Sequence, residues 1–214
     1  MKIGVLGSGI VGQTLAAGLV KHGYEAMMGT REPAKLAEWK AANPRAGVGS
    51  FSEAAAFGEA AILAVKGGVA VEALRLAGSA HLSGKTVIDA CNPIADAPPD
   101  HGVLRLYTAS GQSLMEELQR EFAEARFVKA FNSVGSACMV NPQYAGGIRP
   151  TMFICGNDSA AKATVAEILD KFGWETADMG SAQAARAIEP LCTLWCIPGF
   201  TQNEWTHAFK LLRR

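Results

Sequence analysis

The sequence predicts an α/β fold: a mostly parallel sheet of about eight strands with helices on both faces, followed by a short helical segment. Short apolar runs alternate with alanine- and leucine-rich stretches of helical spacing along most of the chain. The runs are apolar throughout, which is typical of parallel strands that are covered on both faces. A glycine-rich turn joins the first run directly to the first helical stretch. With 214 residues, the chain has the length of one domain, or of one domain with a small appendage.

The first half of the chain alternates strand and helix patterns regularly. We expect strands at Lys2 to Leu6, Tyr24 to Met28, around Val48, Ala61 to Val65 and Thr86 to Ala90. We expect helices at Ile10 to His22, Pro33 to Ala42, from Ser52 onward and at Val69 to Ala77. Ser50 and Glu53 have the spacing of a capping box, which supports the start of the third helix.

The second half continues this alternation and then becomes helical. The expected elements are a helix at Gln112 to Ala123, strands at Arg126 to Phe131, Thr151 to Cys155 and Glu175 to Ala177, and a helix at Ser159 to Phe172. Residues 1–180 are expected to form the main domain, and residues 181–214 a helical extension packed on it or on a second copy. Capping-box spacing at Thr201 and Glu204 predicts a closing helix that ends near Leu212 and packs through Trp205 and Phe209.

Composition excludes several classes of protein. Twenty Lys and Arg balance twenty Asp and Glu, so bulk charge gives no reason to expect binding to nucleic acid or an anionic membrane. The apolar share of 49% and the charged share of 19% are typical of globular proteins rather than disordered ones. No apolar run approaches the roughly 18 residues of a membrane span. Five cysteines without a CxxC pair, and an opening that leads directly into a strand, favour a cytoplasmic protein with buried thiols.

The stretch Gly7-Ser8-Gly9-Ile10-Val11-Gly12 follows the first strand and opens the first helix. This context turns a GxGxxG string into a dinucleotide-binding fingerprint and predicts a Rossmann fold. Gly7 permits the tight turn, Gly9 lets the backbone approach a pyrophosphate, and Gly12 allows close packing of helix against strand. The helix N-terminus supplies amide donors and a favourable dipole for the anion. We expect all six residues to bind the cofactor.

The residues after the second strand favour NADP over NAD. An NAD site places an Asp or Glu there to bind the ribose 2′-hydroxyl, whereas this chain has Thr30 and Arg31. A hydroxyl followed by a guanidinium can bind a 2′-phosphate, which a carboxylate would repel. Lys35, four residues later, could face the same anion from the start of the next helix. Glu32 must point away for this arrangement to work.

Polar residues follow the later strands, at the edge of the sheet where open α/β proteins bind ligands. The strand ends at Val65-Lys66, Ala90 to Asn92 and Ala130 to Ser133 are expected to converge on the cofactor there, and Asn92 could hydrogen-bond its ribose or carboxamide. Lys129 could face either way, so its role stays open. No GxSxG or HExxH motif is present, and of the four histidines only His101 lies near this edge, on an expected surface loop. We expect no metal site.

These residues resemble the family of NADP-dependent oxidoreductases of the deazaflavin coenzyme F420, which also includes the NADPH-binding domain of membrane metalloreductases. The similarity spans nearly the whole chain. Besides the glycine turn and Thr30-Arg31, the matching stretches are Asp89 to Pro93, Val128 to Gly135 and Ile188 to Leu191. The Lys-Ala-Phe-Asn string at Lys129 to Asn132 is the most specific of them.

The resemblance implies a Rossmann domain with a small C-terminal extension, usually a homodimer, in which hydride passes between NADPH and a deazaflavin or flavin. It implies cofactor binding by the glycine turn, Thr30, Arg31, Lys35, Val65 and Asn92, and places Asn132 and Ser133 nearer the second ring. Such a transfer requires two stacked rings rather than an acid and a base. Nothing from Ala95 to Gly102 matches a deazaflavin signature.

Two other functions remain open at this stage. The first is an NADPH-dependent imine or β-hydroxy acid reductase, which shares this type of first domain. Such enzymes generally complete the substrate site with a larger helical domain carrying an acid/base lysine. The second is a non-catalytic NADP-binding sensor module, in which Trp195, Trp205 and Phe209 form a docking face instead of a dimer contact. The partner of the enzyme readings is a small-molecule electron acceptor.

Overall fold

The structure, a computed structural model, describes residues 1–214 and contains eight strands and nine α-helices. The strands are β1 (Lys2–Leu6), β2 (Glu25–Gly29), β3 (Gly47–Gly49), β4 (Ala60–Leu63), β5 (Thr86–Asp89), β6 (Arg126–Lys129), β7 (Thr151–Gly156) and β8 (Glu175–Asp178). The helices are α1 (Ile10–Lys21), α2 (Ala37–Ala42), α3 (Phe51–Phe57), α4 (Ala70–Ala77), α5 (Ser79–Leu82), α6 (Leu114–Glu121), α7 (Ser159–Lys171), α8 (Ala185–Ile188) and α9 (Leu191–Gln202).

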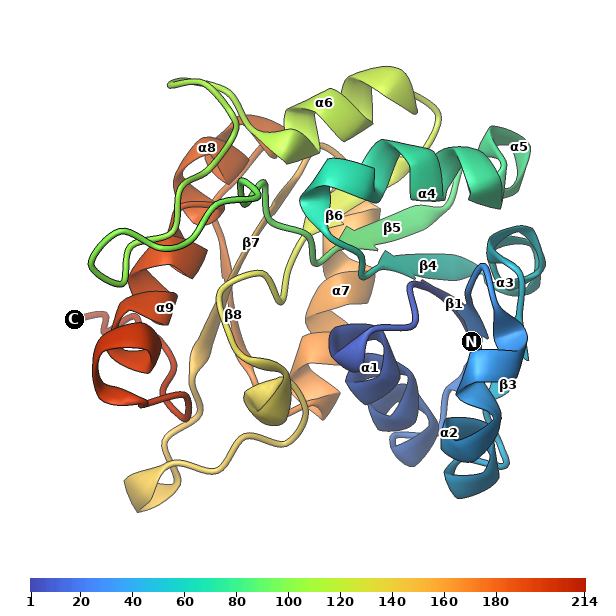
Figure 1. Cartoon of the computed structure of the whole chain (residues 1–214), viewed down its shortest axis with the longest axis horizontal. Helices are drawn as coiled ribbons and strands as arrows, with labels where there is room; N and C mark the ends of the chain where they lie inside the picture. The colour runs from blue at the N-terminus through green and yellow to red at the C-terminus, as the bar shows by residue number, and fades with distance from the viewer.

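All eight strands form one sheet in the order β3-β2-β1-β4-β5-β6-β7-β8. Every neighbouring pair is parallel except β6 and β7, which run antiparallel. The predicted mostly parallel α/β sheet is therefore confirmed, and helices flank it on both sides (Figure 1). The central strands read as continuous apolar runs because the helices exclude water from both of their faces.

Two apolar cores lie on opposite faces of the sheet. In the first, Leu15 and Leu19 of α1 and Ile168 of α7 pack against the sheet. In the second, Leu74 of α4 and Leu118 of α6 pack against the other face, together with residues of α3 and α8. Figure 1 shows α4 and α6 across the sheet from α1. Burial of these two helical layers is the main favourable contribution to folding.

Side-chain caps mark the start of α3, as predicted, and also the start of α6. Ser50 accepts a hydrogen bond from the Glu53 amide, and Glu53 accepts one from the Ser50 amide, so the capping box of α3 is complete. Ser113 caps α6 through the Glu116 amide. The helix expected from Pro33 to Ala42 is instead a 3-10 turn, η1 (Pro33–Leu36), followed by α2.

The closing helix predicted from Thr201 to Leu212 is wrong. Thr201 lies inside α9, where its hydroxyl donates to the carbonyl of Ile197, and the helix ends at Asn203, whose φ of 56° is left-handed. Residues 203–214 form an irregular tail held by main-chain contacts. The Trp195 indole donates to the carbonyl of His207, and the Thr151 amide donates to the carbonyl of Phe209. Leu212 is 83% exposed and packs against nothing extensive.

The C-terminal segment, residues 181–214, lies against β7, α6 and the loop that follows β5. Arg186 of α8 pairs with Glu116 of α6 at 2.6 Å, and the side chains of Thr201 and Phe200 contact Gly102. In Figure 1 the loop around Gly102 runs beside α9. All five cysteines are free thiols, and three of them are buried. No helix is long and apolar enough to cross a membrane.

Candidate NADP and acceptor site

The predicted site residues gather at one edge of the sheet. β1, β2, β4, β5 and β6 run in the same direction, so Gly7, Thr30, Val65, Ala90 and Ala130 follow strand ends at that edge. β2 and β3 lie on one side of β1, and β4 and the later strands lie on the other side. The strand order therefore reverses at β1. Open α/β sheets bind ligands in the crevice at this point.

The glycine turn has the geometry of a phosphate cradle. Gly7 has a φ of 132°, and a Cβ placed on it would lie 2.2 Å from the Ala64 carbonyl oxygen. A Cβ on Gly12 would lie 2.1 Å from the Gly7 carbonyl oxygen, so helix and turn pack without room for a side chain. Gly9, the N-cap of α1, has open space where a Cβ would stand and no side chain that caps the helix. Amides at the start of α1 are therefore free to bind an anion.

The neighbours of the turn fix its shape. Gln13 donates to the Ser8 carbonyl at 2.9 Å, and the Ser8 hydroxyl lies 3.0 Å from that of Thr30. Val11 is half-buried and packs against the core on the α1 face. Ile10 is 67% exposed at the mouth of the turn, where it offers apolar surface beside the crevice. The turn is thus tied directly to the end of β2.

The end of β2 presents the groups predicted to bind a 2′-phosphate. Thr30 is buried, and its hydroxyl accepts a hydrogen bond from the Glu32 amide at 3.3 Å. Arg31 is exposed and forms no ion pair. Lys35 is paired with Glu32 at 2.8 Å, and this contact lowers the pKa of the Glu32 carboxyl. For Lys35 to bind the 2′-phosphate, its ion pair with Glu32 must break. Arg31 can bind the phosphate without breaking an ion pair.

The loops after β4 and β5 contact each other closely. A Cβ on Gly67, the first residue of the 3-10 turn η2 (Gly67–Val69), would lie 2.2 Å from the Asn92 carbonyl oxygen. Val65 is half-buried beside this contact, and Lys66 is exposed at the start of η2. Ala90 is half-buried where β5 ends. Main chain and small side chains thus form this wall of the crevice, and Lys66 and Val69 extend into water.

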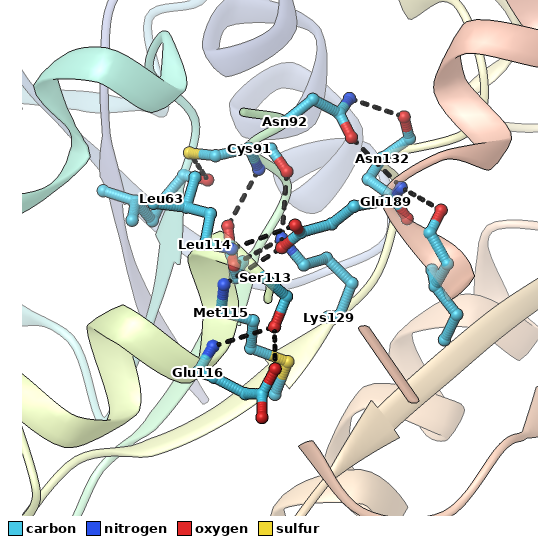
Figure 2. Close-up of polar contacts among 12 residues, drawn as sticks. Leu63, Cys91, Asn92, Ser113, Leu114, Met115, Glu116, Lys129, Asn132 and Glu189 are labelled. Atoms are coloured by element: carbon cyan, nitrogen blue, oxygen red, sulfur yellow. Dashed lines mark hydrogen bonds and ion pairs between the residues drawn. The ribbon is translucent and has the colours of Figure 1, made fainter. Parts of the chain in front are cut away.

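Asn92 and Asn132 are brought together from different strands. The side-chain NH2 of Asn92 donates to the main-chain carbonyl of Asn132 at 2.7 Å. The side-chain NH2 of Asn132 donates to the side-chain oxygen of Asn92 at 3.1 Å and to the main-chain carbonyl of Ile188 at 2.9 Å. Figure 2 shows this chain of contacts. Asn132 is buried, while Asn92 is half-buried and keeps part of its amide at the crevice. The pair joins the ends of β5 and β6 to the C-terminal segment.

Phe131 turns the chain after β6 so that Asn132 meets Asn92. Its φ of 63° is left-handed, which is costly for a bulky residue and persists only where the surroundings enforce it. The Phe131 ring is fully buried against Phe172, at a centroid distance of 6.0 Å, and its amide donates to the Met152 sulfur. Ala130 and Ser133 on either side are also buried. The sequence gave no local signal for this turn.

Lys129, whose role the sequence left open, is fully buried and carries three contacts. Its ammonium lies 2.6 Å from Asp89, 2.8 Å from Glu189 and 3.0 Å from the Cys91 carbonyl oxygen (Figure 2). Burial alone would lower the pKa of Lys129, but the two carboxylates outweigh it and raise that pKa above its usual range. Lys129 is therefore held in its charged form, with its ammonium directed to these three acceptors. His101, the histidine considered earlier, is on the surface with its side chain 90% exposed.

The residues present fit a dinucleotide with a 2′-phosphate. A Cβ on Gly9 would meet nothing within 4 Å, the start of α1 has no side-chain cap, and no carboxylate stands at the position of Thr30. Arg31 offers an unpaired guanidinium next to it. The opposite end of the crevice is walled by Asn92 and Asn132. The arrangement can hold an extended nucleotide cofactor and fix its reactive end, with the glycine turn binding its phosphates.

Comparison with known proteins agrees with this geometry. Residues 2–93 match the family described as NADP oxidoreductase, coenzyme F420-dependent. A solved structure described as a candidate F420-dependent NADP reductase from Arthrobacter sp. FB24 is 35% identical, with a TM-score of 0.92, and the likeness covers 100% of both chains.

The chain belongs to the coenzyme F420-dependent NADP oxidoreductase family. It is accordingly an NADP-dependent oxidoreductase, and the Rossmann fold expected from the glycine turn is confirmed. Metalloreductase STEAP3 of Rattus norvegicus is 32% identical over 203 residues, which are 92% of this chain and 38% of that protein. The chain thus spans about two fifths of that relative's length.

More distant structures share the fold alone. An imine reductase from Streptomyces aurantiacus is 17% identical with a TM-score of 0.67, and the likeness covers 94% of this chain and 64% of that chain. The reductase family therefore has the same sheet as enzymes that act on imines.

Proposed function

We propose that the protein transfers hydride between NADPH and a deazaflavin of the coenzyme F420 type or a flavin. The observation that carries the choice of acceptor is the full-length likeness to the Arthrobacter protein, which extends beyond the NADP-binding half to the C-terminal segment. The crevice supports the donor: a glycine cradle, Thr30 and Arg31 at one end, and the Asn92–Asn132 pair at the other.

In this proposal the chain binds and orients rather than exchanging protons. When bound, NADPH supplies the hydride from C4 of its nicotinamide ring. The α1 amides bind the pyrophosphate, Arg31 binds the 2′-phosphate, and Asn92 holds the nicotinamide end. Asn132 and Ser133 line the end where the two rings meet, and we assign them the positioning role closest to the reaction.

The contacts of Lys129 with three acceptors favour this function over that of an imine reductase. Reduction of an imine needs a proton at nitrogen, whereas the Lys129 ammonium is fully buried and bound to Asp89, Glu189 and the Cys91 carbonyl. Hydride transfer to a deazaflavin or flavin leaves an anionic reduced ring that can take its proton from water, so no acid of the protein is needed at the acceptor.

We further propose that the protein acts as a homodimer in the cytoplasm. Four apolar side chains lie exposed on the outer face of α9 and on the loop beside it: Leu194 (54%), Phe200 (46%), Ile94 (38%) and Val103 (46%). We propose that a second copy covers these exposed apolar side chains. Five free thiols are in keeping with a reducing compartment. Light scattering at micromolar concentration, repeated with Phe200→Asp, tests the dimer.

Side-by-side assays test the acceptor. NADPH oxidation is followed with deazaflavin, with free flavins, with ferric chelates, and with a panel of ketones and imines. We expect turnover with deazaflavin or flavin. Turnover of imines or ketones alone would favour the imine or β-hydroxy acid reductase, and tight NADPH binding without turnover of any acceptor would favour a sensor module.

A further inference from the structure

A buried triad of Lys129, Asp89 and Glu189 lies directly behind the crevice. All three side chains are at most 1% exposed, and they come from β6, β5 and the junction of α8 with α9. Buried charges are costly unless every one is paired and hydrogen-bonded. Burying the triad therefore carries a substantial desolvation cost. Its contacts show which parts of the chain it holds in place.

Each polar atom of Glu189 has a specific donor. One carboxylate oxygen accepts from the Lys129 ammonium at 2.8 Å and from the Met115 amide at 3.0 Å, and the other accepts from the Leu114 amide at 3.0 Å. The two amides are the first of α6, so the helix N-terminus stabilises the negative charge that Lys129 leaves uncompensated. Glu189 thereby caps α6 from a position 74 residues away in the chain.

The triad also fixes the main chain that leads into the crevice. The Cys91 carbonyl accepts from Lys129 at 3.0 Å, and the Cys91 amide donates to Asp89 at 2.9 Å. Both polar groups of the residue before Asn92 are thus held. On the other side, Ile188, which precedes Glu189, accepts the Asn132 amide hydrogen at 2.9 Å. Figure 2 shows Lys129 and Glu189 beside the two asparagines, with Cys91 between Lys129 and Asn92.

We propose that Glu189 is a positioning residue for the nicotinamide end of the crevice, acting through Lys129 and Asp89 on Asn92 and through Ile188 on Asn132. The C-terminal segment is then part of the reductase site rather than an appendage to it. This inference rests on the proposed function only in placing the nicotinamide at the asparagine pair. Glu189 touches neither cofactor nor acceptor, so its effect is on geometry at one end of the crevice.

The test compares Glu189→Gln with the wild type in the full chain. Glutamine places an NH2 group among three donors, Lys129 and the amides of Leu114 and Met115, so the junction must shift. We expect the Kd of 2′,5′-ADP, which probes only the adenosine end, to stay within about twofold of wild type. We expect the fluorescence enhancement of bound NADPH to be largely lost and kcat to fall at least about tenfold.

Arg186→Gln is the matched control. Arg186 also joins α8 to α6, through Glu116 at 2.6 Å, but on the surface and away from the asparagines. If Glu189 only tethers the C-terminal segment, both variants will lose thermal stability and neither will change NADPH fluorescence or kcat, which would overturn the proposal. A loss in Glu189→Gln that Arg186→Gln does not share supports it.

A neutral variant covers the case in which Glu189→Gln does not fold. Asp89→Asn, Lys129→Met and Glu189→Gln combined remove all three charges, so no uncompensated charge is left buried, which is the costly outcome of removing a single partner. Normal NADPH fluorescence and kcat in this folded variant would overturn the proposal, and their selective loss supports it. The fluorescence readout needs no acceptor, so an absence of deazaflavin turnover in the wild type counts against the proposed function alone.

Discussion

Substitution of Arg31 by Ala should weaken binding of NADPH while leaving NADH nearly unaffected. Arg31 is exposed and has no carboxylate partner, so its removal breaks no ion pair within the protein. A guanidinium about 4 Å from a phosphate in water gains about 1 kcal/mol per unit charge, and a phosphate monoester carries about 1.5 to 2 charges at neutral pH. The expected loss is therefore about 2 kcal/mol, or about thirtyfold in Kd.

Fluorescence titration with NADPH and NADH measures this difference directly. Arg45→Ala is the matched control, because Arg45 is an exposed arginine of the same half of the chain whose contact is with the Val20 carbonyl. Raising ionic strength should shrink the effect of Arg31→Ala, since exposed charges are screened. If NADPH binding is unchanged, or if NADH weakens equally, the 2′-phosphate does not bind at Arg31 and the reasoning fails.

Three further outcomes are expected. Gly12→Ala places a Cβ 2.1 Å from the Gly7 carbonyl oxygen, so titration should show NADPH and NADH weakened alike by more than about tenfold; unchanged binding would show that the turn can relax. Ser50→Ala removes the α3 cap and should cost about 1 kcal/mol in urea unfolding, with NADPH affinity unchanged as the internal check. The hydrogen bond from Arg186 lowers the pKa of Glu116 from its usual 4.5. The pair therefore stabilises the folded state above pH 4.5, and this stabilisation is lost as the pH falls through the lowered pKa of Glu116. Glu116→Gln should flatten the acid limb of a stability-against-pH curve, and a parallel limb would contradict this.

The strands were predictable because their apolar character is local. A parallel strand between two helical layers, such as Ala60–Leu63, must be apolar at every position, and this leaves a mark in the sequence itself. The closing helix failed for the opposite reason. Trp205 and Phe209 have helical spacing, but the tail follows contacts with Trp195 and Thr151, which lie far away in the chain. Contacts with residues distant in the sequence, rather than the local helical spacing of apolar residues, determine the conformation of the tail.

The candidate site divides in the same way. The convergence of Asn92 and Asn132 was predictable because parallel strands bring their carboxyl ends to one edge. The partners of Lys129 were not, since Asp89 lies 40 positions before it and Glu189 lies 60 positions after it, on segments whose contact only the folded chain defines. Spacing along the sequence carries no information about a cluster assembled in this manner. The left-handed turn at Phe131 was missed because its cause is the tertiary packing around the ring.

The reversal of direction at β7 sets an outer limit on what the sheet can bind. β7 and β8 bring their amino ends to the edge where the other strands end, so α7, capped by Asp158, begins at the far edge of the sheet from the candidate NADP site. Nucleotide recognition is thereby confined to the strands up to β6.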